Sequence, residues 1–472
     1  MNETPRAGRA LLWLVAVGVF MQMLDSTIVN TALPVMADNL GESPLRMQSV
    51  VIAYALTMAM LIPASGWLAD RFGTRRVFFF AITLFTLGSL LCGISHSLGQ
   101  LVAARVVQGF GGAMLLPVGR LAVLRTCSRS EFLHAMSFVT VPGLIGPLIG
   151  PTLGGWLVQV LSWHWIFLIN LPIGIAAAAA TLRFMPDARR EPARFDLGGY
   201  LMLSFSMVAI SLSLDGLSGL GMQHAVVLVL AVFGLASLIA YWLHATRTAH
   251  PLFPLALFGV PTFRVGLLGN LFSRIGSGSM PFLIPLLLQV SLGYAPMQAG
   301  LMMIPVAIAG MLAKRFVVPL VRSLGYRRVL VGNTVLVGLA MASFALISHD
   351  QPMWLRVLQL ACFGFVNSLQ FTAMNTVTLR DLEGELASGG NSLLSMTMTL
   401  SMSLGVAMAS GLLAAFASLS GSEHGAAALP AFHGTFICVG LVTAASAWIF
   451  WQLEAEAKSP PQSAQVAPLA ED

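Results

Sequence analysis

Three ionisable side chains lie inside long apolar runs of the sequence, namely Asp25, Arg105 and Arg274. Charges inside such runs are costly and are therefore functional candidates. Burial makes a carboxyl group hold its proton more tightly, and a nearby arginine favours release of that proton. Asp25 and Arg105 are therefore predicted to form a proton-coupling site that loads and releases a proton. The alternative for both is a structural role, as a polar anchor between helices.

Arg274 has no acidic residue in its own apolar run. An unpaired interior cation could bind an anionic group of a cargo or a chloride-like counter-ion, and it could equally pair with Asp25. The sequence leaves these interpretations open. Other polar side chains in apolar runs either line an aqueous cavity or bond one helix to another. The predicted cargo contacts are Asn30, Arg274, Asn367, Gln370 and Asn391.

A short charged turn, Gly66–Arg76, lies between two apolar runs and carries one acid and three arginines. A related turn, Val318–Arg328, lies between two apolar runs in the second half of the chain. A recurring loop predicts two related halves, as in many secondary transporters. The alternative is that any short basic loop of a transporter has this composition. The positions that match are Gly73, Arg75 and Arg76 with Gly325, Arg327 and Arg328.

Glycine recurs at every fourth position in the apolar run 134–160. This spacing gives one helix face without side chains, against which a second helix can approach closely. Prolines in the same run remove backbone hydrogen bonds and are expected to bend the helix. We predict a bent helix on which two halves of the molecule rock, with ordinary helix packing as the alternative. The residues assigned to it are Gly143, Gly146, Pro147, Gly150, Pro151, Gly154 and Gly155.

Membrane helices must position these residues. The chain of 472 residues is 57% hydrophobic and 9% charged, and its mean hydropathy is +0.83. Soluble domains contain about 25% charged residues, so the sequence predicts an all-α polytopic membrane protein. At roughly 20 apolar residues for each crossing, about fourteen spans are expected, at 11–36, 47–69, 77–96, 100–124, 134–160, 164–184, 197–217, 224–243, 262–290, 297–320, 328–348, 354–378, 387–417 and 431–453.

The distribution of arginines predicts the orientation and the domains. Arginines gather in alternate loops, and such loops face the cytoplasm, so both termini are expected there. The matching turns place six spans on either side of two inserted ones. The predicted organisation is a cytoplasmic N-terminus (1–10), a six-helix half (11–185), a cytoplasmic linker (186–196), two inserted helices (197–243), a second six-helix half (244–453) and a disordered cytoplasmic tail (454–472).

Several classes of protein find no support in the sequence. It contains no Gly-Lys-Ser/Thr phosphate loop and no histidine and cysteine grouping, so neither an enzyme nor a cofactor nor a bound metal is expected. The net charge of +6 comes from 25 Lys+Arg against 19 Asp+Glu, and the arginines between apolar runs indicate lipid headgroups rather than nucleic acid. The expected partners are the bilayer, protons and a small-molecule cargo. A proton gradient would supply the energy to a monomer, with or without other efflux components.

Several of these motifs together resemble the major facilitator superfamily. Gly66–Arg76 is similar to its loop signature, and Arg105–Gly112 is similar to its fourth-span motif. Gly143–Gly155 resembles the fifth-span motif of its antiporters. Leu24–Pro34 and Trp163–Pro172 resemble the fourteen-span drug:proton antiporter branch.

The resemblance implies the major facilitator fold with two extra helices, proton-driven efflux and a bacterial inner-membrane location. In the family, the acid matching Asp70 latches the cytoplasmic side in one state. The resemblance also implies proton transfer by Arg105, and coupling or cation recognition by Asp25. Because Arg322 stands where a second acid would be, two symmetrical latches are not expected. The predicted gating loop comprises Gly66, Asp70, Arg71, Gly73, Arg75 and Arg76.

The sequence thus predicts a proton-coupled exporter that works by alternating access. The resemblance implies drugs or other small amphipathic molecules as cargo. One interior acid against two interior arginines favours neutral or anionic cargo, such as an organic acid or a metal chelate. Two alternatives are a proton-coupled importer of an organic anion and a transport-inactive membrane sensor or scaffold. A sensor or scaffold would not need Asp25.

Overall fold

The computed structural model describes residues 6–126, 129–187, 189, 194–216, 223–420 and 428–453, and these residues form helices and short connections without a strand. The predicted tail, 454–472, lies outside the described residues. The helices are α1 (Arg6–Leu40), α2 (Gln48–Phe72), α3 (Thr74–Gly93), α4 (Leu98–Thr126), α5 (Arg129–Val160), α6 (Trp165–Leu168), α7 (Asn170–Phe184), α8 (Leu197–Gly216), α9 (His224–Arg247), α10 (Ala256–Gly259), α11 (Pro261–Ser277), α12 (Met280–Leu286), α13 (Pro296–Leu301), α14 (Ile304–Ala342), α15 (Met353–Leu379), α16 (Gly384–Ser420), α17 (Leu429–Ala445) and α18 (Ala447–Phe450).

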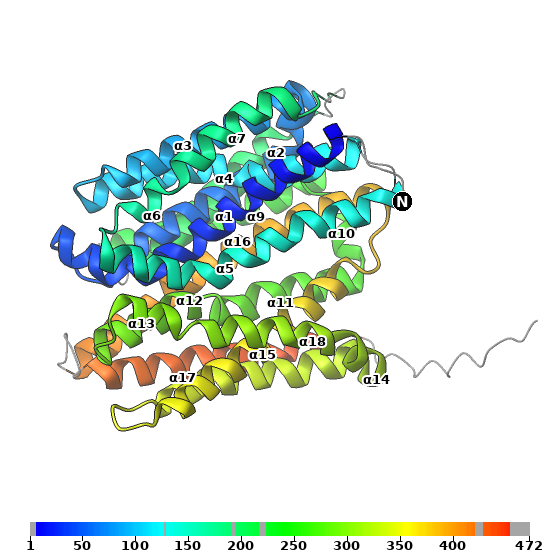
Figure 1. Cartoon of the computed structure of the whole chain (residues 1–472). Helices are drawn as coiled ribbons and strands as arrows, with labels where there is room; N and C mark the ends of the chain where they lie inside the picture. The colour runs from blue at the N-terminus through cyan, green and yellow to red at the C-terminus, as the bar shows by residue number, and fades with distance from the viewer. Residues whose placement is uncertain are drawn as a thin grey trace, which may run out of the picture.

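The long helices run roughly side by side in two bundles, which Figure 1 shows one above the other. In the first bundle α1 packs on α5, and α3 packs on α4 and α7. In the second bundle α14 packs on α15 and α17, and α11 packs on α16. The bundles meet where α2 contacts α16 and where α5 contacts α13. We call the bundle of α1–α7 the first half and the bundle of α11–α18 the second half.

The helices are long and apolar enough for a polytopic membrane protein. Among the described residues, twelve helical segments could cross a membrane by length and composition. One of them, Pro296–Leu346, has 51 residues, about twice the length that a single crossing needs. It is interrupted by non-helical backbone at Gly325 and so forms two arms. With these arms and α5, the described helices agree with the expected number of about fourteen spans.

The two repeated turns have the same backbone conformation. Gly73 has φ 90° and ψ 146° between α2 and α3, and Gly325 has φ 78° and ψ 158° within α14. Positive φ strains any residue with a Cβ atom, which explains why glycine stands at both positions. The turn is shorter than the sequence indicates, because α2 continues to Phe72 and α3 begins at Thr74.

The largest hydrophobic cluster that the two halves share lies at one end of the molecule. We call this the distal end; it holds the end of α1 at Leu40 and the start of α2 at Gln48, at the left of Figure 1. One cluster of buried residues there combines both halves, for example Ile28 with Leu283. Toward the opposite end, where α1 begins, each half has a cluster of its own, around Phe78 and Leu330. A smaller cluster still joins α2 to α16 there, for example Leu56 with Leu393.

Two polar contacts add to the shared core at the distal end. Thr152 Oγ1 of α5 donates to the Gly300 carbonyl at 3.2 Å. Gln289, in a π-helical turn after α12 (Leu287–Ser291), donates from Nε2 to the Thr31 carbonyl of α1 at 2.9 Å. Both bonds join the first half to the second, so the halves are fastened together at this end.

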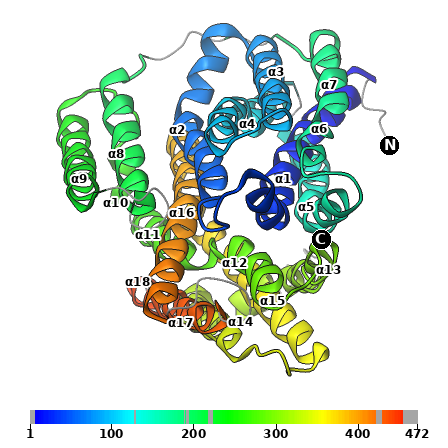
Figure 2. The ribbon, with the colours of Figure 1, turned by 90° about the vertical axis from the view of Figure 1, so that its left-hand side faces the viewer.

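The pair α8 and α9 lies outside the two bundles, beside α2 and α16 (Figure 2). α8 makes the main contacts with those two helices, through polar pairs as well as apolar side chains. Gln48 Nε2 donates to Asp215 Oδ1 at 2.5 Å, and Ser211 Oγ lies 3.4 Å from Ser403 Oγ. The pair therefore covers one of the two lines along which the halves meet.

Candidate functional site

Asp25 lies on α1, whose side chains near this position pack against α5. Gly146 and Gly150 of α5 lie on the α1 backbone at Leu24 and on the Thr27 side chain, where a Cβ would collide. The hydroxyl of Thr27 donates to the Met23 carbonyl at 3.0 Å and so needs no partner outside the helix. The glycine face of α5 therefore positions the helix that carries Asp25.

α5 is one continuous helix despite three internal prolines. Its glycine face lies mainly within the first half, since Gly143, Gly146, Gly150 and Gly154 face α1. Gly155 instead lies on the Pro296 carbonyl of the second half. The rocking motion predicted for this helix stays a prediction. The close contacts with the second half that the structure describes, at Pro151, Thr152 and Gly155, lie toward its distal end.

Asp25 and Arg105 form a buried ion pair. Arg105 Nη1 donates to Asp25 Oδ2 at 2.6 Å, and the side chains of Asp25 and Arg105 are 0% and 1% exposed, respectively. Arg105 Nε donates to the Val50 carbonyl at 3.2 Å, and its guanidinium lies 4.0 Å from the centre of the Tyr54 ring. Removing one partner of a buried ion pair costs about 3–5 kcal/mol, because the other charge stays buried without compensation.

Three uncharged residues complete the cluster around Asp25. Gln108 Nε2 donates to Asp25 Oδ1 at 2.8 Å and to Ser89 Oγ at 2.7 Å, while its Oε1 accepts from Arg105 at 2.7 Å. Asn170 Nδ2 lies 3.4 Å from Asp25 Oδ1 and 3.2 Å from Ser89 Oγ. Close approach of α3 to α4 at Gly88 brings Gln108 and Ser89 together. Every one of these polar groups is buried, so the carboxylate is held within a closed network.

Arg274 lies on α11 and has no acidic partner among the described residues. Its Nε donates to Asn270 Oδ1 at 3.1 Å, and its guanidinium lies 4.2 Å from the centre of the Phe371 ring. Its Nη2 is buried without a hydrogen-bond partner in the described part of the chain. Of the interpretations that the sequence left open, pairing with Asp25 is therefore not seen, because the described partners of Asp25 are Arg105, Gln108 and Asn170.

The other predicted cargo contacts lie in different settings. Asn30 is 5% exposed and donates to the Ser26 carbonyl within α1. Gln370 is 2% exposed, accepts from Asn333 at 2.9 Å and donates to Thr334 at 2.6 Å, which is helix-to-helix bonding. Asn367 and Asn391 are half-buried. The geometry thus separates Asn30 and Gln370, which are buried, from Arg274, Asn367 and Asn391, which are partly accessible.

Asp70, in the predicted gating loop, pairs with Arg125 at the end of α4, so its charge partner lies in the same half. The loop also binds the linker: Thr74 Oγ1 donates to the Pro186 carbonyl at 2.7 Å, and Arg75 Nε donates to the Met185 carbonyl at 2.5 Å. The Trp67 ring lies against the Phe195 ring, with the centres 4.9 Å apart and the planes tilted by 35°. The loop is therefore fixed to the end of α4 and to the linker.

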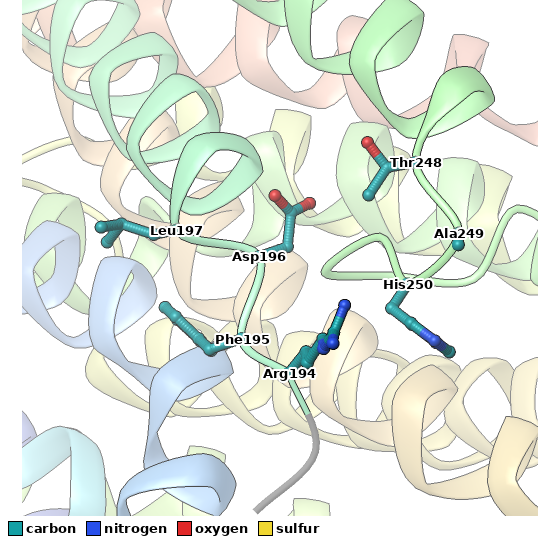
Figure 3. Close-up of a pocket in the computed structure, with 7 residues that line it drawn as sticks. All are labelled: Arg194, Phe195, Asp196, Leu197, Thr248, Ala249 and His250. Carbon is teal, nitrogen blue, oxygen red and sulfur yellow. The ribbon is translucent and has the colours of Figure 1, made fainter.

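A shallow pocket lies beside the linker, away from the Asp25 cluster. Figure 3 shows residues 194–197 on one side and 248–250 on the other. Asp196 accepts from the Gly199 and Leu252 backbone amides at 2.9 and 3.1 Å and lies 2.8 Å from His244 Nε2. Burial raises the pKa of Asp196, but these hydrogen bonds outweigh burial, so its pKa lies below the usual value. Asp196 therefore ties the linker to both inserted helices and to the segment that follows them.

The sequence did not indicate Gln108, Asn170 or Asp215 as site residues. Gln108 follows Arg105 by three positions and so shares its helix face, which could have pointed to it. Asn170 comes from a distant segment, and no spacing in the sequence relates it to Asp25. Asp215 is 3% exposed at the end of α8. It lies close to the end of the predicted span 197–217, so the sequence did not indicate that it is buried.

Two helical bundles whose long segments are apolar enough to cross a membrane define a polytopic membrane protein. Residues 15–406 and, in a second match, residues 267–471 fit the profile described as the Major Facilitator Superfamily. The chain belongs to this superfamily, as the resemblance of its motifs predicted.

Curated relatives match nearly the whole chain. It is 53% identical over 445 residues to a protein of Serratia proteamaculans, covering 94% of this chain and 93% of that protein. It is 51% identical over 455 residues to a protein of Cronobacter sakazakii, covering 95% and 96%. Both relatives carry the name MdtD, with multidrug resistance as a provisional description.

A solved structure of a POT family transporter in complex with 5-aminolevulinic acid has a similar fold. The TM-score is 0.68 over 94% of this chain and 95% of that one, at 16% sequence identity. At this identity the likeness concerns the fold alone.

Proposed function

We propose that the chain is a proton-coupled exporter of neutral or anionic small molecules that works by alternating access. One observation carries the proposal: the acid of the first half is paired, whereas Arg274 of the second half is a cation without an acid among the described residues. The paired carboxylate suits exchange of a proton, and the unpaired cation suits binding of an anionic group. The names of the relatives support efflux as the direction of transport.

The proposed cycle follows from the end of the molecule at which the two halves are joined. With both termini in the cytoplasm of a bacterial cell and the protein in the inner membrane, the shared distal core faces the periplasm. Cargo would then enter between the halves from the cytoplasm. Asp25 releases its proton to the cytoplasm, and protonation from the periplasm returns the carrier after cargo has left. Asp70 would exchange Arg125 for a contact with the second half when the cytoplasmic side closes.

Transport in proteoliposomes tests proton coupling. Asp25→Asn should abolish uptake or efflux driven by a pH gradient while exchange of cargo against cargo continues, because the neutral amide cannot release a proton. Asp215→Asn is a matched control, since it replaces another buried carboxyl group that bonds to an amide. Gradient-driven transport that survives in the Asp25 variant would remove Asp25 from coupling.

A cargo screen tests the proposed preference for neutral or anionic cargo. Export by an exporter-depleted bacterium would be scored both as drug resistance and as secreted organic acids. Arg274→Gln should reduce export of anions, whereas Lys314→Gln, which removes an exposed cation of α14, should not. Export of lipophilic cations alone would contradict the role assigned to Arg274. Absence of transport with every cargo would favour a sensor or scaffold.

A further inference from the structure

The side-chain oxygen of Asn170, close to Asp25, is a buried hydrogen-bond acceptor without a partner among the described residues. Asn170 is the first residue of α7 and is 1% exposed. Its Nδ2 lies 3.4 Å from Asp25 Oδ1, but its Oδ1 is buried and has no partner among the described residues. Native proteins rarely leave a buried acceptor unpaired, so this oxygen requires a physical explanation.

Gln108 presents the same amide groups to Asp25, but all of them are in use. Its Nε2 donates to Asp25 and Ser89, and its Oε1 accepts from Arg105 at 2.7 Å. Rotating this amide by half a turn would set its NH2 against the guanidinium, which also only donates. Arg105 therefore keeps Gln108 as a donor to Asp25, and a donor suits the ionised carboxylate.

A protonated Asp25 needs an acceptor instead, because its new O–H group is a buried donor. The ionisable groups that interact with Asp25 are Tyr54 on α2, Cys92 on α3 and Arg105 on α4. The nearby segments 143–155 of α5, 170–174 of α7 and 280–286 of α12 contain no ionisable residue.

None of these three ionisable groups accepts from Asp25. Arg105 has no acceptor atom, and the Tyr54 hydroxyl has no hydrogen-bond partner among the residues that the structure describes. Cys92 Sγ lies 3.8 Å from Gln108 Oε1, to which it donates. Asn170 Oδ1 is thus the unpaired acceptor on a residue that already contacts the carboxylate.

We propose that Asn170 is a positioning residue for the coupling proton, and that its amide turns over when Asp25 is protonated. A hydronium ion from the aqueous side gives its proton to Oδ1 and leaves as water, while Oδ2 stays bonded to Arg105. Rotation of the amide exchanges its nitrogen and oxygen, so Asn170 Oδ1 then accepts from Asp25. Asn170 can therefore form a hydrogen bond with Asp25 in both protonation states, whereas Gln108 can only donate to the ionised one. The inference rests on the proposed proton coupling at Asp25.

Infrared difference spectroscopy of the purified full-length protein can test this without knowledge of the cargo. Lowering the pH should produce the C=O band of a protonated carboxyl group, and Asp25→Asn should remove it. Asn170→Leu removes, at similar volume, the acceptor that the protonated form needs. It also removes a donor 3.4 Å from Asp25 Oδ1, but Arg105 and Gln108 still donate to the ionised form at 2.6 and 2.8 Å. The midpoint of this band should therefore move to lower pH by about one unit. Asn170→Gln should keep the midpoint nearer that of the wild type, because it retains a carboxamide that both donates and accepts.

The outcomes separate this inference from the proposed function. If the wild type shows no band that Asp25→Asn removes, proton coupling at Asp25 fails and the inference fails with it. If the band is present and Asn170→Leu leaves its midpoint unchanged or moves it to higher pH, only the inference is overturned. Asn333→Leu, which removes a buried amide of the second half, should leave the midpoint unchanged. If Asn170→Leu does not fold, Asn170→Ala gives the same test.

Discussion

The two halves hold their interior charge in opposite ways. In the first half Asp25 is neutralised by Arg105 and bonded to Gln108. In the second half Arg274 has an amide and an aromatic ring as neighbours and keeps one nitrogen unpaired among the described residues. The charge of Asp25 is therefore neutralised without a ligand, whereas that of Arg274 is not. Under the function proposed above, the first half would bind the proton and the second half would bind the cargo.

The repeated turns differ in the same way. Both use a glycine with positive φ, but Asp70 of the first turn forms an ion pair with Arg125. In the second turn Arg327 lies 4.7 Å from the centre of the Trp451 ring, and Arg380 lies 5.5 Å from that of Tyr326. The backbone of the turn is common to both halves, whereas its charge partners are not. Asp70 is thus specific to the first half.

The largest expected effect is a difference in stability between variants of the two interior arginines. Arg105→Met should lower the free energy of unfolding by about 3–5 kcal/mol, because it leaves Asp25 buried without a counter-charge. Arg274→Met should leave stability unchanged or raise it, because no acid loses a partner. Thermal unfolding in detergent measures both. Equal losses in the two variants would mean that Arg274 has a charge partner after all.

The second expected effect concerns binding. Arg274→Gln should weaken binding of an anionic cargo about 10- to 100-fold, since a hydrogen bond to a charged group contributes about 1.5–3 kcal/mol. Binding of a neutral cargo should change little. Isothermal titration calorimetry with matched acid and amide forms of one cargo would show the difference. An equal loss for both forms would indicate a general distortion of the site.

A smaller effect is expected at the turns. Asp70→Asn should change stability by less than about 1 kcal/mol, because the carboxylate is 30% exposed and such pairs are weak. It should nevertheless alter how often the end near the termini is open, as measured by labelling of a cysteine introduced between the halves. Arg327→Leu, in the second turn, should leave that labelling unchanged. An equal change in both variants would make the turns equivalent.

The smallest effect is expected outside both halves, at Asp196. Because the pKa of Asp196 lies below its usual value, its ionised form stabilises the folded state. The difference in melting temperature between wild type and Asp196→Asn should be full above about pH 3.9 and shrink as the pH falls through the lower folded value. Thermal scans against pH measure it. A difference that grows toward acid pH would mean that folding raises the pKa of Asp196 instead of lowering it.

The sequence predicts the helices well because hydropathy and length determine them almost alone. The sequence also shows that the turn glycine is repeated, at Gly73 and Gly325, whereas the positive φ of both is known from the structure. The contact between Asp25 and Arg105 is harder to predict, since burial and charge suggest a partner without saying which helix supplies it. Asn170 could not be predicted to approach Asp25, because that contact depends on how α7 lies against α1 and α3. Burial of Asn30 and Gln370 depends on packing between helices in the same way.

The bond from Gln289 to the Thr31 carbonyl has a mechanical consequence. Thr31 lies on the same helix as Asp25, and six residues at 1.5 Å each separate them by about 9 Å along its axis. A continuous helix is rigid over so short a distance. A displacement of α1 that accompanies protonation would therefore reach the fastening at the distal end almost undiminished. Protonation of Asp25 could then affect the distal contact through movement of α1 itself, without a series of side chains between them.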